Sequence, residues 1–187
     1  MARIGLLGGT FDPPHIAHLI AAERAIDAIA LDKVLFIPAA VPPHKSEAKI
    51  SSVEDRLAML RLATHDNPKF EISTIELDRP GPSYTIDTLR QLKQQSPSDN
   101  FVLLIGTDQF QQFDSWREPD QILSLAEIVV VARSSSQQRR DGFRFFDMPL
   151  IDISATEIRQ RVRDGRTIRY LVPDAVRTYI AAHHLYQ

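Results

Sequence analysis

Cysteine is absent from the 187 residues of this chain. Its absence excludes disulfides, zinc sites built from thiolates and a cysteine nucleophile. The chain also has no apolar run near the ~20 residues that span a membrane, and its first residues do not resemble a secretory signal. From these absences we expect a cytoplasmic protein without a membrane partner.

An excess of charge of either sign is also absent. Lysine and arginine total 22 against 24 acidic residues, so the formal net charge is -2. This balance provides no global attraction to nucleic acid, and an anionic ligand would need a local site. The length and an apolar share of 43% are typical of one well-buried domain, which we predict to span residues 1–187. The composition leaves open whether the chain forms a homo-oligomer.

Short apolar runs alternate with segments of helical periodicity along the whole chain. Strands are predicted at 3–7, 33–39, 70–77, 101–106, 127–133 and 143–148. Helices are predicted at 16–30, 51–66, 83–95, 119–126, 154–165 and 172–184. This alternation predicts an α/β fold, Rossmann-like and doubly wound, with helices on both faces of a mostly parallel sheet. Ligands bind such sheets beyond the carboxyl ends of the strands.

The segment "GGTFDPPHIAH" follows the first predicted strand. Its two glycines allow a sharp turn, but their spacing matches neither a P-loop nor the dinucleotide fingerprint. With Pro14 or His15 as the first helical residue, His15 and His18 lie on one face of the first turn. Two imidazoles at a helix N-terminus favour a phosphate. The alternative is that both histidines pack or cap the helix; a zinc site would lack a third ligand nearby.

A second candidate anion site begins with "ISATEIR", at the start of the helix predicted from residue 154. Ser154 and Glu157 have the spacing of a capping box. Thr156 and Arg159 are three residues apart and lie on one face, so they can bind an anion at the same helix N-terminus. Capping and anion binding are compatible here.

Two further polar residues have a structural and a functional interpretation. Asp108, in "GTDQF" after a buried strand, either accepts a hydrogen bond from a ribose hydroxyl or caps a short helix, and the sequence favours the cap. Lys45, in the proline-rich "PPHK", either reaches a phosphate or lies in a solvated loop, and the sequence does not distinguish the two.

The segment "GPSYTIDTL" reads as a turn followed by a helix capped by Ser83, with Tyr84 and Thr85 available beside the cap. The single tryptophan, Trp116, lies among polar residues, which favours stacking on a ligand over packing in the core. The arginines of segment 133–144 lack an aromatic platform, so we do not expect nucleic-acid binding.

These candidate residues together indicate a polyphosphate site without a P-loop. Two predicted helix N-termini, two histidines, a lysine and an arginine can position phosphates and stabilise charge. No Ser-His-Asp set or cysteine is available as a nucleophile. The chemistry available to these residues is therefore positioning and charge stabilisation around an in-line phosphoryl centre.

"GGTFDPPHIAH" and "ISATEIR" resemble the paired signature of the HxGH nucleotidyltransferase superfamily. "PPHK", "GPSYTIDTL", "GTDQFQQFDSW" and "VPDAVRTYI" are similar to one branch, the bacterial nicotinate-mononucleotide adenylyltransferases of NAD biosynthesis. The resemblance runs from Gly8 to about Ile180. It implies adenylyl transfer from ATP to nicotinate mononucleotide, giving nicotinate adenine dinucleotide and pyrophosphate. The resemblance also implies direct in-line attack without a covalent enzyme intermediate. One departure is Ala17, where the family motif usually has glycine; its methyl group would narrow the space for ATP.

The resemblance also implies residue roles. The catalytic residues would be His15, His18, Lys45 and Arg159. Further ATP contacts would come from Gly9, Thr10, Phe11, Gly106, Asp108, Arg133, Ser154 and Thr156. Nicotinate mononucleotide would be bound by Lys45, Tyr84, Thr85 and Trp116. Mg²⁺ would accompany ATP, held mainly by phosphates and water, with no metal site built from protein ligands.

Alternatives to this function remain open at the level of sequence. The acceptor of the same chemistry could instead be nicotinamide mononucleotide, phosphopantetheine or the acceptor of a cytidylyl group. A second alternative is a nucleotide sensor that kept the fold without catalysis. Such a protein would often have lost a histidine of the first motif or the arginine of the last, and all of these are present here. A zinc hydrolase would require ligands that the sequence does not supply near the histidines.

Overall fold

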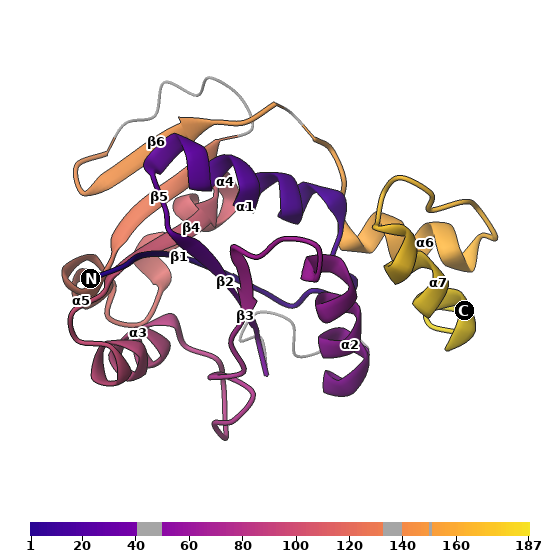
Figure 1. Ribbon diagram of the computed structural model, residues 1–187, viewed down its shortest axis with the longest axis horizontal. Coiled ribbons are helices and arrows are strands. Elements are labelled where there is room, and N and C mark those ends of the chain that lie inside the picture. The colour runs from indigo at the N-terminus through magenta and orange to yellow at the C-terminus, as the bar shows by residue number, and fades with distance from the viewer. Residues whose placement is uncertain (41–49, 133–139, 150) are drawn as a thin grey trace.

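The computed structural model describes residues 1–40, 50–132, 140–149 and 151–187 (Figure 1). Their strands form one six-stranded sheet in the order β3-β2-β1-β4-β5-β6, and every neighbouring pair is parallel. The strands are β1 (Arg3–Gly9), β2 (Lys33–Pro38), β3 (Phe70–Ile72), β4 (Asn100–Gly106), β5 (Glu127–Ala132) and β6 (Phe143–Asp147). The predicted doubly wound fold is confirmed. Because strand order reverses between β1 and β4, their carboxyl ends border a crevice suited to a ligand.

Helices cover both faces of the sheet (Figure 1). The helices are α1 (Ile16–Ile29), α2 (Val53–Thr64), α3 (Thr85–Gln95), α4 (Thr107–Gln111), the 3-10 turn η1 (Phe113–Ser115), α5 (Pro119–Leu125), α6 (Ala155–Arg163) and α7 (Asp174–Ala182). The apolar face of α1 is buried on one side, and α3, α4 and α5 bury theirs on the other. Helices α6 and α7 form a separate apolar cluster with Met59 of α2.

The N-cap of α3 differs from the prediction. Tyr84, not Ser83, is the N-cap of α3, because the Ser83 hydroxyl instead accepts a hydrogen bond from the Ala40 N–H at 3.0 Å. Helix α2 is capped by Ser52, whose hydroxyl accepts from the Asp55 N–H at 3.0 Å. At the start of α3, a tertiary contact therefore selects between two neighbouring polar residues.

The predicted strand 70–77 is wrong beyond Ile72, because the chain turns there and the Asp78 N–H donates to the Thr74 carbonyl at 3.0 Å. The favoured cap at Asp108 is also wrong. Gly106 is the N-cap of α4, and Asp108 lies exposed in its first turn. A helix as short as α4 has too few residues to display a period, so its start could not be placed from the sequence.

Candidate active site

The loop after β1 has an unusual backbone conformation at Phe11, whose φ is 52°. The ring of Phe11 is 2% exposed and lies directly over Gly9. A Cβ at Gly9 would lie 3.1 Å from this ring, which is tighter than ordinary van der Waals contact. A side chain at this position would therefore require the Phe11 ring to shift by a few tenths of an ångström.

The two motif histidines meet at the start of α1. The helix begins at Ile16 and His15 is its N-cap, so the prediction of Pro14 or His15 as the first helical residue is wrong by one or two positions. The His15 N–H donates to Nδ1 of His18 at 3.2 Å. Their rings are stacked with centroids 3.7 Å apart, and the ring of Phe11 lies 5.1 Å from that of His18. The pair therefore caps the helix and also lines the first cavity described below.

Arg56 of α2, which the sequence analysis missed, ties this loop to the rest of the fold. Its side chain is 2% exposed. The guanidinium donates to the carbonyls of Thr10 at 3.0 Å, Ala39 at 2.8 Å and Ser51 at 3.3 Å. Burial lowers the pKa of Arg56, and the nearby Asp12 carboxylate opposes that shift. A buried charge therefore holds together the ends of β1 and β2 and the segment before α2.

Asp12 connects the same loop to the end of the chain. Its carboxylate is 3% exposed and accepts from the Tyr186 hydroxyl at 2.6 Å and the Ser51 N–H at 3.2 Å. Burial and the bond to Asp12 raise the pKa of Tyr186. The Asp12 carbonyl accepts from the Arg159 guanidinium at 2.7 Å. Hydrogen bonds from α6 and from the C-terminal segment thus hold the loop after β1 in place.

The sequence contains one signal for this network. Arg56 precedes the buried residues Met59 and Leu60 by three and four positions, so it lies on the inward face of α2. A charged residue at an inward helical position requires buried partners. No comparable signal exists for Tyr186, since its contact to Asp12 spans 174 residues.

The first cavity lies beyond the carboxyl ends of β1, β4 and β5 and has a volume of about 430 Å³. Among the residues predicted to bind ATP, those lining it are Gly9, Thr10, Phe11, His15, His18, Gly106, Ser154, Thr156 and Arg159. Ala17, the departure from the family motif, also lines it and is 8% exposed. Asp108 lines neither this cavity nor the second one. Lys45 and Arg133 lie outside the described residues.

The N-terminus of α6 faces the first cavity. Ser154 caps the helix as predicted, with its hydroxyl accepting from the Glu157 N–H at 3.1 Å. The Arg159 guanidinium donates to the Thr156 hydroxyl at 3.2 Å. A helix N-terminus, two hydroxyl groups and a guanidinium thus lie together, which is an arrangement suited to phosphate oxygens.

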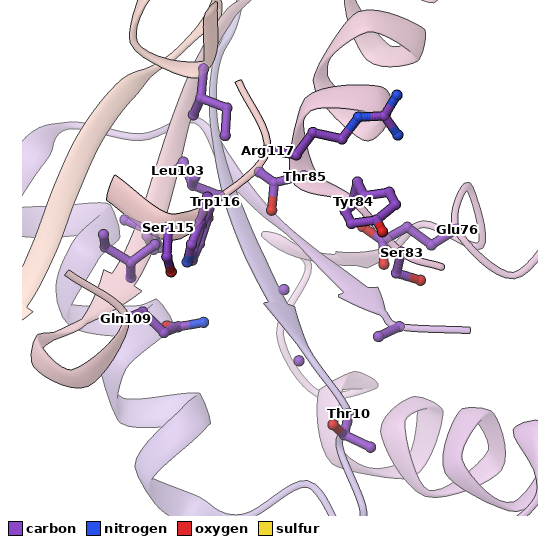
Figure 2. Close-up of a pocket in the computed structure, with 16 residues that line it drawn as sticks. Thr10, Glu76, Ser83, Tyr84, Thr85, Leu103, Gln109, Ser115, Trp116 and Arg117 are labelled. Carbon is purple, nitrogen blue, oxygen red and sulfur yellow. The ribbon is translucent and has the colours of Figure 1, made fainter. Parts of the chain in front are cut away.

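A second cavity of about 260 Å³ lies beside the first (Figure 2). Trp116 lies on one side of it, and Tyr84 and Thr85 at the start of α3 lie on the other. The Trp116 ring also contacts Phe113 at a centroid distance of 5.4 Å, so it packs and lines the cavity at once. The two cavities share a wall made of Gly8, Gly9, Thr10, Leu104, Ile105 and Gln109.

Comparison with known proteins agrees with this arrangement. Residues 6–161 match the model of the family described as cytidylyltransferase-like. A protein of Geobacillus thermodenitrificans described as a "probable nicotinate-nucleotide adenylyltransferase" is 45% identical, over 100% of this chain and 87% of the relative. The chain belongs to the nicotinate-nucleotide adenylyltransferases. A family member from Exiguobacterium sibiricum with the same description is 46% identical, over 98% of each chain.

Solved structures support the fold of this nucleotidyltransferase. Nicotinic acid mononucleotide adenylyltransferase of Plasmodium falciparum, complexed with NaAD, superposes with a TM-score of 0.84 at 17% identity, covering 100% of this chain and 98% of that one. A solved structure from Vibrio parahaemolyticus superposes with a TM-score of 0.75 at 18% identity, covering 100% of this chain and 96% of that one. At such identities the likeness establishes the fold.

Neither a metal cluster nor a membrane-spanning helix occurs within the described ranges. No three histidine, aspartate or glutamate residues are grouped so that they could hold a metal ion. None of the described helices is both long enough and apolar enough to cross a bilayer.

Proposed function

We propose that the chain transfers the adenylyl group of ATP to nicotinate mononucleotide, as the descriptions of its relatives suggest. The observation that carries the proposal is the wall shared by the two cavities. ATP in the first cavity and a pyridine nucleotide in the second would meet at Gly8, Gly9 and Thr10. The reacting phosphates would then be held at the loop after β1, where proximity lowers the barrier to transfer.

In the proposed step, an oxygen of the acceptor phosphate forms a bond to the α-phosphorus of ATP. The bond from that phosphorus to the oxygen bridging to the β-phosphate breaks, and pyrophosphate leaves with the electron pair. His15 and His18 would donate hydrogen bonds to the oxygens that gain charge in the transition state. Because the acceptor attacks directly, no enzyme nucleophile is required.

The leaving pyrophosphate would be held at the N-terminus of α6. Ser154, Thr156 and Arg159 lie there on the cavity, and the helix dipole adds favourable potential for an anion. Arg159 is oriented in advance by its bonds to the Asp12 carbonyl and the Thr156 hydroxyl. Lys45 and Arg133 would add phosphate and adenine contacts.

Mg²⁺ would enter with ATP and neutralise charge on the triphosphate. The lining of the first cavity fits this role, because its single carboxylate among the described residues is Asp12. Both oxygens of that carboxylate are already hydrogen-bonded, to Tyr186 and to Ser51. The ion would therefore be coordinated by phosphate oxygens and water. We place the reaction in the cytoplasm.

Trp116 would stack on the pyridine ring in the second cavity, facing the start of α3. Among the described residues no side chain caps α3, so its first N–H groups would be able to receive the ring carboxylate of the acid. This favours nicotinate mononucleotide over its amide, which lacks that charge.

The proposal is tested by pyrophosphate release from ATP and Mg²⁺ with each of two acceptors, nicotinate mononucleotide and the corresponding amide. We expect release with a preference for the acid. His65→Ala is a suitable control for His18→Ala, because the side chain of His65 is 64% exposed and lines neither cavity. Equal use of both acceptors would contradict the acid preference. ATP binding without release from either acceptor would indicate a nucleotide sensor instead.

A further inference from the structure

The second cavity has only two charged residues among the described residues that line it, Glu76 and Arg117. The two acceptors considered above differ by one charge, because the acid has a ring carboxylate and the amide does not. The balance between one lining carboxylate and one lining guanidinium therefore affects the two acceptors differently.

Arg117 directly follows Trp116 in the chain, and its guanidinium packs over the ring of Tyr84 on the opposite wall of the second cavity. Its guanidinium carbon is 5.0 Å from the centroid of the Tyr84 ring, within the range of a cation–π contact. Tyr84 is the N-cap of α3. The positive charge of Arg117 is thus placed beside the helix N-terminus that would receive the ring carboxylate.

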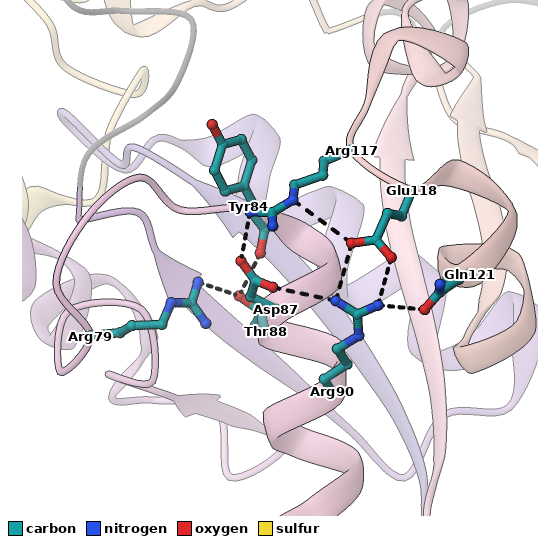
Figure 3. A network of polar contacts seen from close by, with 8 residues as sticks. All are labelled: Arg79, Tyr84, Asp87, Thr88, Arg90, Arg117, Glu118 and Gln121. Atoms are coloured by element: carbon teal, nitrogen blue, oxygen red, sulfur yellow. Dashed lines mark hydrogen bonds and ion pairs between the residues drawn. The ribbon is translucent and has the colours of Figure 1, made fainter.

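A network of ion pairs holds Arg117 in this position (Figure 3). Arg117 lies 3.6 Å from the Asp87 carboxylate and 3.7 Å from that of Glu118. Arg90 donates two hydrogen bonds to Glu118, at 3.1 and 2.6 Å, and this lowers the pKa of the Glu118 carboxyl. Asp87 is in the first turn of α3, where its charge would repel an anionic acceptor. Arg90 and Arg117 together offset that charge.

The negative charge of Glu76 has the opposite effect to that of Arg117 on a carboxylate in the second cavity. It is 9% exposed, and its Oε1 accepts from the Thr88 hydroxyl at 2.7 Å. Arg79 donates to the same hydroxyl at 3.3 Å (Figure 3). A carboxylate held in the wall of a cavity disfavours a second carboxylate inside it more than it disfavours an amide.

We propose that Arg117 is a specificity-determining residue for the acid over the amide, and that Glu76 limits this preference. The inference rests on the proposed function, since it concerns the acceptor of the same reaction. Its distinctive consequence is that two substitutions in one cavity shift the acceptor preference in opposite directions. A residue with a purely structural role would lower the use of both acceptors together.

The test measures kcat/KM for the acid and the amide at saturating ATP and Mg²⁺, in the wild-type chain, Arg117→Met, Arg117→Lys and Glu76→Gln. Arg117→Met should lower the acid-to-amide ratio by about two- to fivefold, the effect expected of a half-exposed charge. Glu76→Gln should raise the ratio, and Arg117→Lys should keep it near the wild-type value. The KM for ATP should not change in any variant.

Arg140→Met is a matched control. Arg140 also forms an ion pair, to Asp114 at 2.6 Å, and lies 5.0 Å from the ring of Phe143, but it lines neither cavity. It should leave the ratio unchanged. An unchanged ratio in Arg117→Met, or an equal loss with both acceptors, would overturn the inference while leaving the proposed function intact. If the wild-type chain releases pyrophosphate with neither acceptor, both are overturned.

Discussion

Replacing the buried Arg56 by methionine removes a charge while keeping most of the side-chain volume. The substitution removes the hydrogen bonds that Arg56 donates to three main-chain carbonyls, those of Thr10, Ala39 and Ser51. It also removes the positive charge that faces the buried Asp12 carboxylate. We expect a large loss of stability together with a displaced loop after β1.

The magnitude follows from the burial of the site. Removing one partner from a buried charged network costs about 3–5 kcal/mol. Because a domain of this size loses about 2–4 °C in melting temperature per kcal/mol, Arg56→Met should melt about 6–20 °C below the wild-type chain. Typical domains have about 5–15 kcal/mol of stability, so the variant should still fold near 20 °C. At that temperature its KM for ATP should be raised, since Thr10 lines both cavities.

Thermal unfolding followed by circular dichroism, with pyrophosphate-release kinetics at 20 °C, measures both effects. Arg166→Met is the matched control, because Arg166 is 53% exposed and pairs only with Asp164 among the contacts of the described residues. That substitution should change stability by about 1 kcal/mol or less. If Arg56→Met melted within about 2 °C of the wild-type chain and kept its KM for ATP, Arg56 would not hold the loop.

Three further substitutions test other parts of the site. His18→Ala should lower turnover about a hundredfold or more, because a donor to the transition state is lost, while circular dichroism shows an intact fold; near-normal turnover would contradict its role. Ala17→Gly should cost about 1 kcal/mol or less in helix stability, measured by thermal unfolding, with turnover retained; a loss of turnover would mean that the methyl group is needed. The raised pKa of Tyr186 means that its stabilising contribution is present below about pH 10 and is lost as the pH rises further, since the unfolded chain releases the phenolic proton first. Unfolding measured between pH 8 and 11 should therefore show a steeper alkaline loss in the wild-type chain than in Tyr186→Phe, and equal slopes would exclude this linkage.

The sequence alone determined the class of fold and most of the first cavity. The period of apolar residues can be read within a short window of the sequence, and it distinguishes strands from helices. The alternation of the two periods along the chain therefore made the parallel sheet predictable. The segments around His18 and Arg159 each follow a strand or begin a helix, and the carboxyl ends of parallel strands share one edge of the sheet. That geometry alone brings the two motifs to one cavity.

Only the tertiary structure determined which residues hold this site in place. Tyr186 reaches Asp12 across 174 residues, and Arg117 reaches Asp87 between a loop and a helix. Such contacts leave no periodic trace, because each side chain is selected by a neighbour that is distant in the chain. The cap at Tyr84 shows the same limit: Ser83 has the residue type of a cap, but a contact to Ala40 occupies its hydroxyl. Local sequence indicates which residues are able to act as a cap or a hydrogen-bond partner. Long-range packing decides which of them does so, because it determines which polar groups are buried away from water.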